Sequence, residues 1–144
     1  MPSAQNWFAW ALFSAVFAAL TAIFAKIGLE GVDSDYATLI RTFVIAAVLM
    51  LIVGLAGKWR SPLSLPPKAL TFLVLSGLAT GASWFCYFRA LKAGDASRVA
   101  PVDKLSVVLV AIFAVVFLGE RPIAREWAGI GLVGAGVLLL SLKR

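Results

Sequence analysis

The sequence has few of the residues that enzymes use for chemistry. Its 144 residues include no histidine and one cysteine, Cys86, and only 14% are charged. Without histidine the common zinc and haem sites and the histidine-dependent nucleophiles are excluded, and one cysteine excludes an intrachain disulfide framework. No HExxH or GxSxG motif is present. We therefore expect no metal site, no cofactor and no enzymatic activity.

Apolar residues take the place of the missing charges. Hydrophobic residues make up 62% of the chain, and a soluble domain this short could not hide so much apolar surface from water. The sequence therefore predicts a multi-pass membrane protein in contact with lipid. The net charge of +6 could suggest nucleic acid, but the basic residues are scattered between apolar runs. Because a nucleic-acid site needs a basic face, we expect no nucleic-acid partner.

Five apolar runs are each near the roughly 20 residues that a helix needs to cross a bilayer. Strands of a membrane barrel would be about 10 residues long with alternating polarity, which these runs lack. Glycine, proline and aspartate separate the runs, as expected for turns. The predicted fold class is an all-α integral membrane protein, one transmembrane domain over residues 1–144, with spans at 7–27, 36–57, 69–88, 96–118 and 127–142.

The distribution of Lys and Arg barely specifies an orientation. Five spans place the termini on opposite sides, and the positive-inside rule requires an excess of Lys and Arg on one of them. The excess here is one residue, so either the chain inserts both ways, or a partner or the embedded cations Arg41 and Lys104 decide. The N-terminal side carries Lys58, Arg60, Lys68, Arg121 and Arg125, and the opposite side carries Lys26, Arg89, Lys92, Arg98, Lys143 and Arg144.

Residues 87–140 carry a family resemblance. They contain the loop Ala-Ser-Arg-Val-Ala-Pro at 96–101, the Leu-Gly-Glu-Arg at 118–121 that closes the fourth span, and a glycine-rich fifth span. The first half agrees through AKIGLEG at 25–31 and through Arg41. The chain resembles an EamA-type repeat of the drug/metabolite transporter superfamily, in particular its short five-span bacterial and archaeal members.

The resemblance implies an architecture and a function. Larger members have ten spans built from two repeats of opposite orientation around a substrate path, and a single repeat must obtain its second half from another chain. We therefore expect a homodimer in the inner (cell) membrane, antiparallel if both orientations are inserted. It would move a small organic solute by alternating access. The near-balanced Lys and Arg are what such a dimer needs.

Two opposite charges stand inside the fourth span, in the stretch APVDKLS. Asp103 lies about 10 Å along the helix from Ala96, and an embedded charge needs a partner. Neighbouring residues on a helix diverge by about 100°, so Asp103 and Lys104 are not expected to meet. Arg41, at similar depth in the second span, is the predicted partner of Asp103. Pro101 predicts a kink at this charged turn.

The embedded residues allow several interpretations. Asp103, Lys104 and Arg41, with Trp84 and Tyr87 of the third span, are the predicted substrate and coupling residues, and Asp103 is the candidate for proton coupling. Alternatively, Asp103 and Arg41 form a structural pair while Lys104 reaches the bilayer surface. The two aromatic rings could cage a cationic substrate or simply pack between helices.

Small residues let helices approach closely in lipid. The short fifth span has four glycines that we predict at the dimer interface, and these are Gly129, Gly131, Gly134 and Gly136. A second function from another class remains open: a non-transporting membrane subunit that assembles into a larger complex, with its charges serving assembly. Substrate, transport direction and coupling ion are not specified by the sequence.

Overall fold

The computed structural model describes residues 6–142 of the chain. Within that range every regular element is a helix, and five helical segments are long and apolar enough to cross a membrane. This confirms the prediction of five helical spans. Lys143 and Arg144, which entered the charge comparison, lie outside the described residues. The five segments are Trp7–Gly28, Ser34–Leu55, Pro67–Ala93, Ala96–Leu118 and Ala124–Ser141.

The chain divides into two compact units. Unit 1 comprises Met1–Ile23 and Gly94–Arg144, and unit 2 comprises Phe24–Ala93. Helix α1 (Asn6–Gly28) contributes its first turns to unit 1 and its last turns to unit 2.

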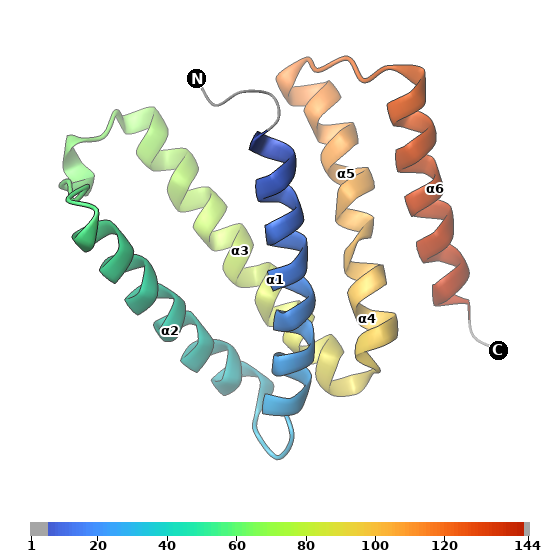
Figure 1. Ribbon diagram of the computed structural model, residues 1–144, viewed down its shortest axis with the longest axis horizontal. Helices are drawn as coiled ribbons and strands as arrows, with labels where there is room; N and C mark the ends of the chain where they lie inside the picture. Colours follow the sequence, from blue (N-terminus) through green and yellow to red (C-terminus); the bar gives the residue numbers. More distant parts are fainter. Residues whose placement is uncertain (1–5, 143–144) are drawn as a thin grey trace. The chain divides into compact units, whose positions relative to one another are not determined.

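Unit 2 is built on α2 (Ser34–Leu55) and α3 (Pro67–Ala93), which are joined through the short 3₁₀ helix η1 (Pro62–Ser64) (Figure 1). Gly31, with a φ of +71°, turns the chain between α1 and α2, a conformation in which glycine carries no steric penalty. The Asp33 carboxylate then caps α2 by accepting hydrogen bonds from the backbone N–H groups of Asp35 and Tyr36. Leu29, Phe88 and Leu91 are buried where α1 ends and α3 ends.

The third helix is longer than the sequence predicted. It ends at Ala93, five residues beyond the predicted residue 88. The additional residues include the charged Arg89 and Lys92, which are part of the helix. Both side chains are directed to partners on the α1–α2 loop and on α2. A charged residue therefore did not mark the end of the helix.

Unit 1 contains the broken fourth span and α6 (Ala124–Ser141) (Figure 1). Helix α4 (Ala96–Asp103) contains Pro101 and stops at Lys104, and α5 (Leu105–Phe113) begins directly after it. Lys104 N–H donates to the Pro101 carbonyl at 2.9 Å, a three-residue turn that interrupts the α pattern. The interruption lies at the charged turn where the sequence predicted a kink.

The fourth span ends in a way that the sequence did not predict. Residues Ala114–Leu118 form the π-helical turn η2, and Gly119 follows with a φ of +67°. The N–H of Glu120 donates back to the carbonyl of Ala114 at 3.2 Å. This left-handed glycine closes the span in the manner of a helix C-cap, and the chain then turns into α6.

Most apolar side chains of the two units are exposed. The buried apolar residues in the described part of the chain are Ala22, Leu29, Phe88, Leu91, Ala114 and Val137. Large side chains such as Phe17 and Phe43 remain 66% and 69% exposed. Surface of this kind is unstable in water and must be covered by lipid or by other protein, which agrees with a membrane protein.

The packing of α5 against α6 depends on Gly134, where a Cβ atom would lie 3.2 Å from Val108 Cγ2. We expect Gly134→Val to lower the thermal unfolding temperature of the purified chain in detergent, because overpacking costs about 1–3 kcal/mol. Gly77→Val is the matched control, since no atom lies within 4 Å of a Cβ at Gly77. Equal unfolding temperatures for the two variants would contradict this packing.

Candidate functional site

Arg41 lies on α2 against the aromatic face of α3. Its guanidinium carbon is 4.2 Å from the centroid of the Trp84 ring and 5.2 Å from that of Phe88. None of the described acidic side chains in unit 2 forms an ion pair or hydrogen bond with Arg41. The structure therefore brings the predicted residues Arg41 and Trp84 together, and it holds the cation by cation–π contacts.

The two predicted aromatic residues, Trp84 and Tyr87, have partners within unit 2. Trp84 is half-buried and presents a ring face to Arg41, so that face already holds a cation of the chain itself. Tyr87 is also half-buried and packs edge-on against Phe88, with ring centroids 6.5 Å apart. The cage for a cationic substrate that Trp84 and Tyr87 could form is therefore occupied, on the Trp84 face, by Arg41.

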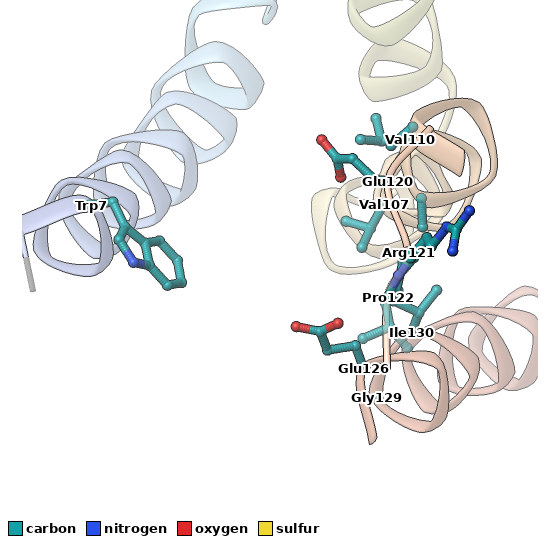
Figure 2. Close-up of a pocket in the computed structure, with 12 residues that line it drawn as sticks. Trp7, Val107, Val110, Glu120, Arg121, Pro122, Glu126, Gly129 and Ile130 are labelled. Carbon is teal, nitrogen blue, oxygen red and sulfur yellow. The ribbon is translucent and has the colours of Figure 1, made fainter. Parts of the chain in front are cut away.

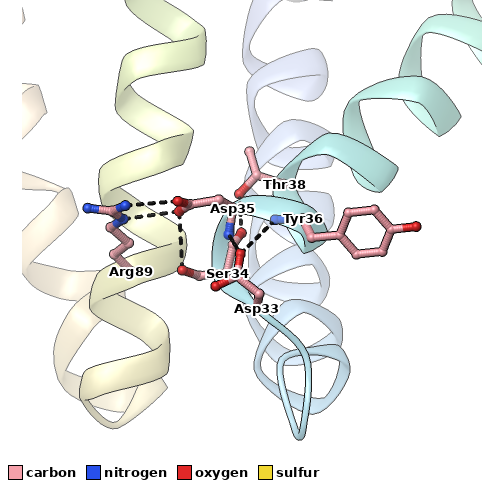
Figure 3. Close-up of polar contacts among 6 residues, drawn as sticks. All are labelled: Asp33, Ser34, Asp35, Tyr36, Thr38 and Arg89. Carbon is pink, nitrogen blue, oxygen red and sulfur yellow. Dashed lines mark hydrogen bonds and ion pairs between the residues drawn. The ribbon is translucent and has the colours of Figure 1, made fainter.

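Asp35 and Arg89 form an ion pair that the sequence analysis did not identify (Figure 3). Arg89 donates from Nε to Asp35 Oδ1 at 3.0 Å and from Nη2 to Oδ2 at 2.8 Å, which is the two-point geometry that suits a guanidinium and a carboxylate. It joins the first turn of α2 to the last turns of α3. The sequence does contain a signal for this pair. An acid stands at the start of the second span and an arginine near the end of the third, and both ends lie on the side opposite the N-terminus.

Two lysines at the same end of unit 2 bond to backbone oxygens. Lys26 of α1 donates to the carbonyl of Leu91 at 2.6 Å, and Lys92 of α3 donates to the carbonyl of Val32 in the α1–α2 loop. These carbonyls lie at a helix end and in a loop, where backbone acceptors are left without helical partners. The lysines therefore tie α1, the loop and α3 to one another.

Asp103 and Lys104 form an ion pair with each other, at 3.4 Å between Oδ2 and Nζ. The prediction that these neighbours do not meet is wrong. The side chains of helical neighbours start about 100° apart, but the lysine side chain is long enough to fold back to the carboxylate of the preceding residue. The side chain of Asp103 is 36% exposed and that of Lys104 is 54% exposed. Since Arg41 and Asp103 belong to different units, their pairing stays a prediction.

Unit 1 contains an open apolar groove of about 780 Å³ (Figure 2). Trp7 of α1 lies on one side, and Val107, Val110 and Ile130 of α5 and α6 lie on the other. Glu120 and Glu126 also line it. Glu126 also accepts a hydrogen bond from the N–H of Ile123 at 2.8 Å, which caps α6. The sequence analysis did not single out this groove; a Glu three residues after a helix start is the signal for such a cap.

The four glycines predicted at a dimer interface occupy different places on α6. Gly134 packs on Val108 of the same chain, and Gly129 lines the groove. At Gly131 and Gly136 a Cβ would meet no atom within 4 Å. Gly131 is exposed and Gly136 is half-buried, and the place of these glycines at a dimer interface stays a prediction.

Comparison with known proteins assigns the family. The model of the EamA-like transporter family matches residues 5–142. The chain belongs to this family. As an EamA-like transporter it is not an enzyme, and it contacts lipid and solute. No solved structure matches the chain.

Three relatives of this EamA-like chain illustrate its range. It is 58% identical over 138 residues to an uncharacterized transporter in the cobO 3′ region of a Sinorhizobium species, covering 96% of this chain and 98% of the relative. The uncharacterized transporter YwfM of Bacillus subtilis is 29% identical, over 73% of this chain but 35% of its own length. A probable 4-amino-4-deoxy-L-arabinose-phosphoundecaprenol flippase subunit, ArnE, of Yersinia pestis is 29% identical, over 50% of this chain and 63% of its own.

If Asp35 and Arg89 act as a pair, removing both must cost less than the sum of the two separate losses. We expect Asp35→Asn and Arg89→Gln each to lower the unfolding temperature in detergent, and the double variant to lower it little further. Asp35→Asn combined with Arg98→Gln is the control, because Arg98 forms no ion pair among the described residues. Additive losses in the first double variant would show that the contact contributes nothing.

Proposed function

We propose that this EamA-like protein is one half of a homodimeric transporter, which moves a small organic solute across the cell membrane by alternating access. The observation that carries the proposal is that one family repeat of five candidate spans occupies nearly the whole chain. The Sinorhizobium relative, named a transporter, aligns over 98% of its length with this chain. The Bacillus transporter aligns over 35% of its length, as expected for a protein with room for two repeats.

An antiparallel arrangement of the two copies follows from the span count and the charges. In a chain with two repeats of five spans each, the second repeat starts on the opposite side of the membrane and is therefore inverted. Two separate copies form the same inverted pair only if they insert in opposite orientations. The Lys and Arg excess of one residue leaves both orientations accessible. The Gly131 surface of α6 offers a site at which two copies could approach closely.

A second function is favoured by one observation. The Yersinia relative is named a flippase subunit, so this chain could instead assemble with a different membrane protein, without transport of its own. That arrangement requires one orientation of the chain, set by the partner. The orientation of the C-terminus therefore separates the two functions.

The position of the C-terminus can be measured with two reporters fused after Arg144, each active on only one side of the bacterial inner membrane. We expect both reporters to be active, because the antiparallel homodimer needs both orientations. Activity of one reporter alone would overturn the antiparallel dimer and favour assembly with another chain.

Cysteine cross-linking tests the antiparallel dimer independently of the reporters. In a Cys86→Ser background, Gly131→Cys lies near the middle of α6, where two antiparallel copies cross, whereas Leu138→Cys lies on the same face two turns away. Antiparallel copies should cross-link through position 131 and not through position 138. Cross-links at both positions would indicate a parallel dimer.

Asp103 is the residue that we propose for proton coupling. It is a partly exposed carboxylate at a break in the fourth span, beside Lys104, and such a group can take up and release a proton as its surroundings change. In vesicles, Asp103→Asn should abolish solute accumulation driven by a proton gradient and leave solute exchange intact. Asp95→Asn is the control, because Asp95 precedes the span. Full accumulation by a folded Asp103→Asn dimer would remove this role.

A further inference from the structure

We propose that Arg41 binds an anionic oxygen group, a carboxylate or a phosphate, on the transported solute. The inference rests on the proposed transport function and names the substrate class for part of its site. The site consists of Arg41 on α2 and of Trp84 and Phe88 on α3, whose rings hold its guanidinium.

The first support is that Arg41 differs from the other cations at the same end of unit 2. Lys26 and Lys92 donate to backbone carbonyls, and Arg89 donates to a carboxylate. Arg41 has aromatic faces as its partners, and its N–H groups form no hydrogen bond to the described residues of unit 2. An arginine has five N–H donors, so Arg41 keeps a complete set for a ligand.

The second support is the position of Arg41 within its helix. It stands seven positions after Ser34, the start of α2, so it lies about 10 Å along the span. A cation at such a depth is costly unless something neutralises it, and intramembrane cations commonly mark substrate paths. Aromatic contacts lower that cost but leave the positive charge in place.

The third support is orientation. The Trp84 ring lies against the guanidinium at 4.2 Å, and this contact restricts the rotation of a long side chain. A planar guanidinium held in this way presents its N–H edge, which matches two oxygens of one anionic group. Tyr87 is half-buried and stands next to Phe88 on the same helix.

The charges of unit 2 near this site favour an anionic solute over a cationic one. The Asp35 carboxylate is bonded to Arg89, and the Asp33 carboxylate caps α2. A cation approaching Arg41 would therefore meet positive charge that neither of these carboxylates neutralises, whereas an anion would be attracted. The anionic oxygens could belong to a free solute or to a lipid headgroup, since both have the chemistry that Arg41 recognises.

Equilibrium binding of radiolabelled benzoate to the full chain in phosphatidylcholine nanodiscs tests the inference. We expect saturable binding that phenyl phosphate displaces and benzylammonium does not. Arg41→Gln should weaken the affinity about tenfold or more, the effect of losing hydrogen bonds to a charged group. Arg41→Lys keeps the positive charge and should weaken binding less than Arg41→Gln does. It therefore distinguishes loss of the charge from loss of folding. Arg60→Gln is the charge-matched control outside the spans and should have no effect.

Three results of this experiment would overturn the inference, and one would assign the anion site to a lipid headgroup. Unchanged binding by folded Arg41→Gln, or displacement by benzylammonium as effective as by phenyl phosphate, would overturn the inference. So would binding that occurs only in Asp103→Asn, because Arg41 would then be neutralised by the chain's own carboxylate. Displacement by added phosphatidylglycerol, lost in Arg41→Gln, would support the anion site and assign it to a lipid headgroup.

The binding measurement requires neither a dimer nor transport. A chain that binds benzoate through Arg41 but transports nothing in vesicles would overturn the proposed function and leave the anion site intact. A chain that transports, with folded Arg41→Gln fully active, would overturn the anion site alone.

Discussion

The last two turns of α3 hold unit 2 together. Arg89 bonds to Asp35 on α2, Lys92 bonds to the loop before α2, and Lys26 of α1 bonds to the carbonyl of Leu91. Leu91 and Phe88 are the most deeply buried residues of the unit, at 0% and 2% exposed. Apolar side chains gain little by exchanging lipid for one another, so the polar contacts at this end set how the three helices pair. The apolar length of α2 beyond them remains exposed.

Arg41 depends on that constraint. The contacts at the end of α3 fix its register against α2, and this register brings Trp84 and Phe88 to the guanidinium. Because Asp35 is already bonded to Arg89, it does not neutralise Arg41. The same contacts therefore satisfy the charges near the helix ends and leave one oriented cation within the span. In unit 1 the charges are arranged differently: Asp103 and Lys104 meet at a break in the fourth span.

Particular residues show how far sequence reasoning reached. Helix length and apolar content identified all five spans, and Pro101 with its charged neighbours identified the break near Lys104. The pairing of Asp103 with Lys104 was missed because the starting directions of neighbouring side chains do not show how far a long lysine can fold back. Asp35 and Arg89 were missed because both stand near span ends, where a charge can also be satisfied by water or headgroups, so an acid and an arginine on the same side were not taken as partners. Gly134 could not be told from Gly131, because small residues serve contacts within a chain and between chains alike.

The sequence by itself determined the family, the number of spans and the membrane setting, because these follow from local composition and from the length that a bilayer imposes. Only the tertiary structure decided which charge meets which. Partner choice depends on the rotation and register of each helix about its axis, and a rotation of one residue turns a side chain by about 100° to another face. Arg41 against Trp84, rather than against a carboxylate of unit 2, is the consequence of that register.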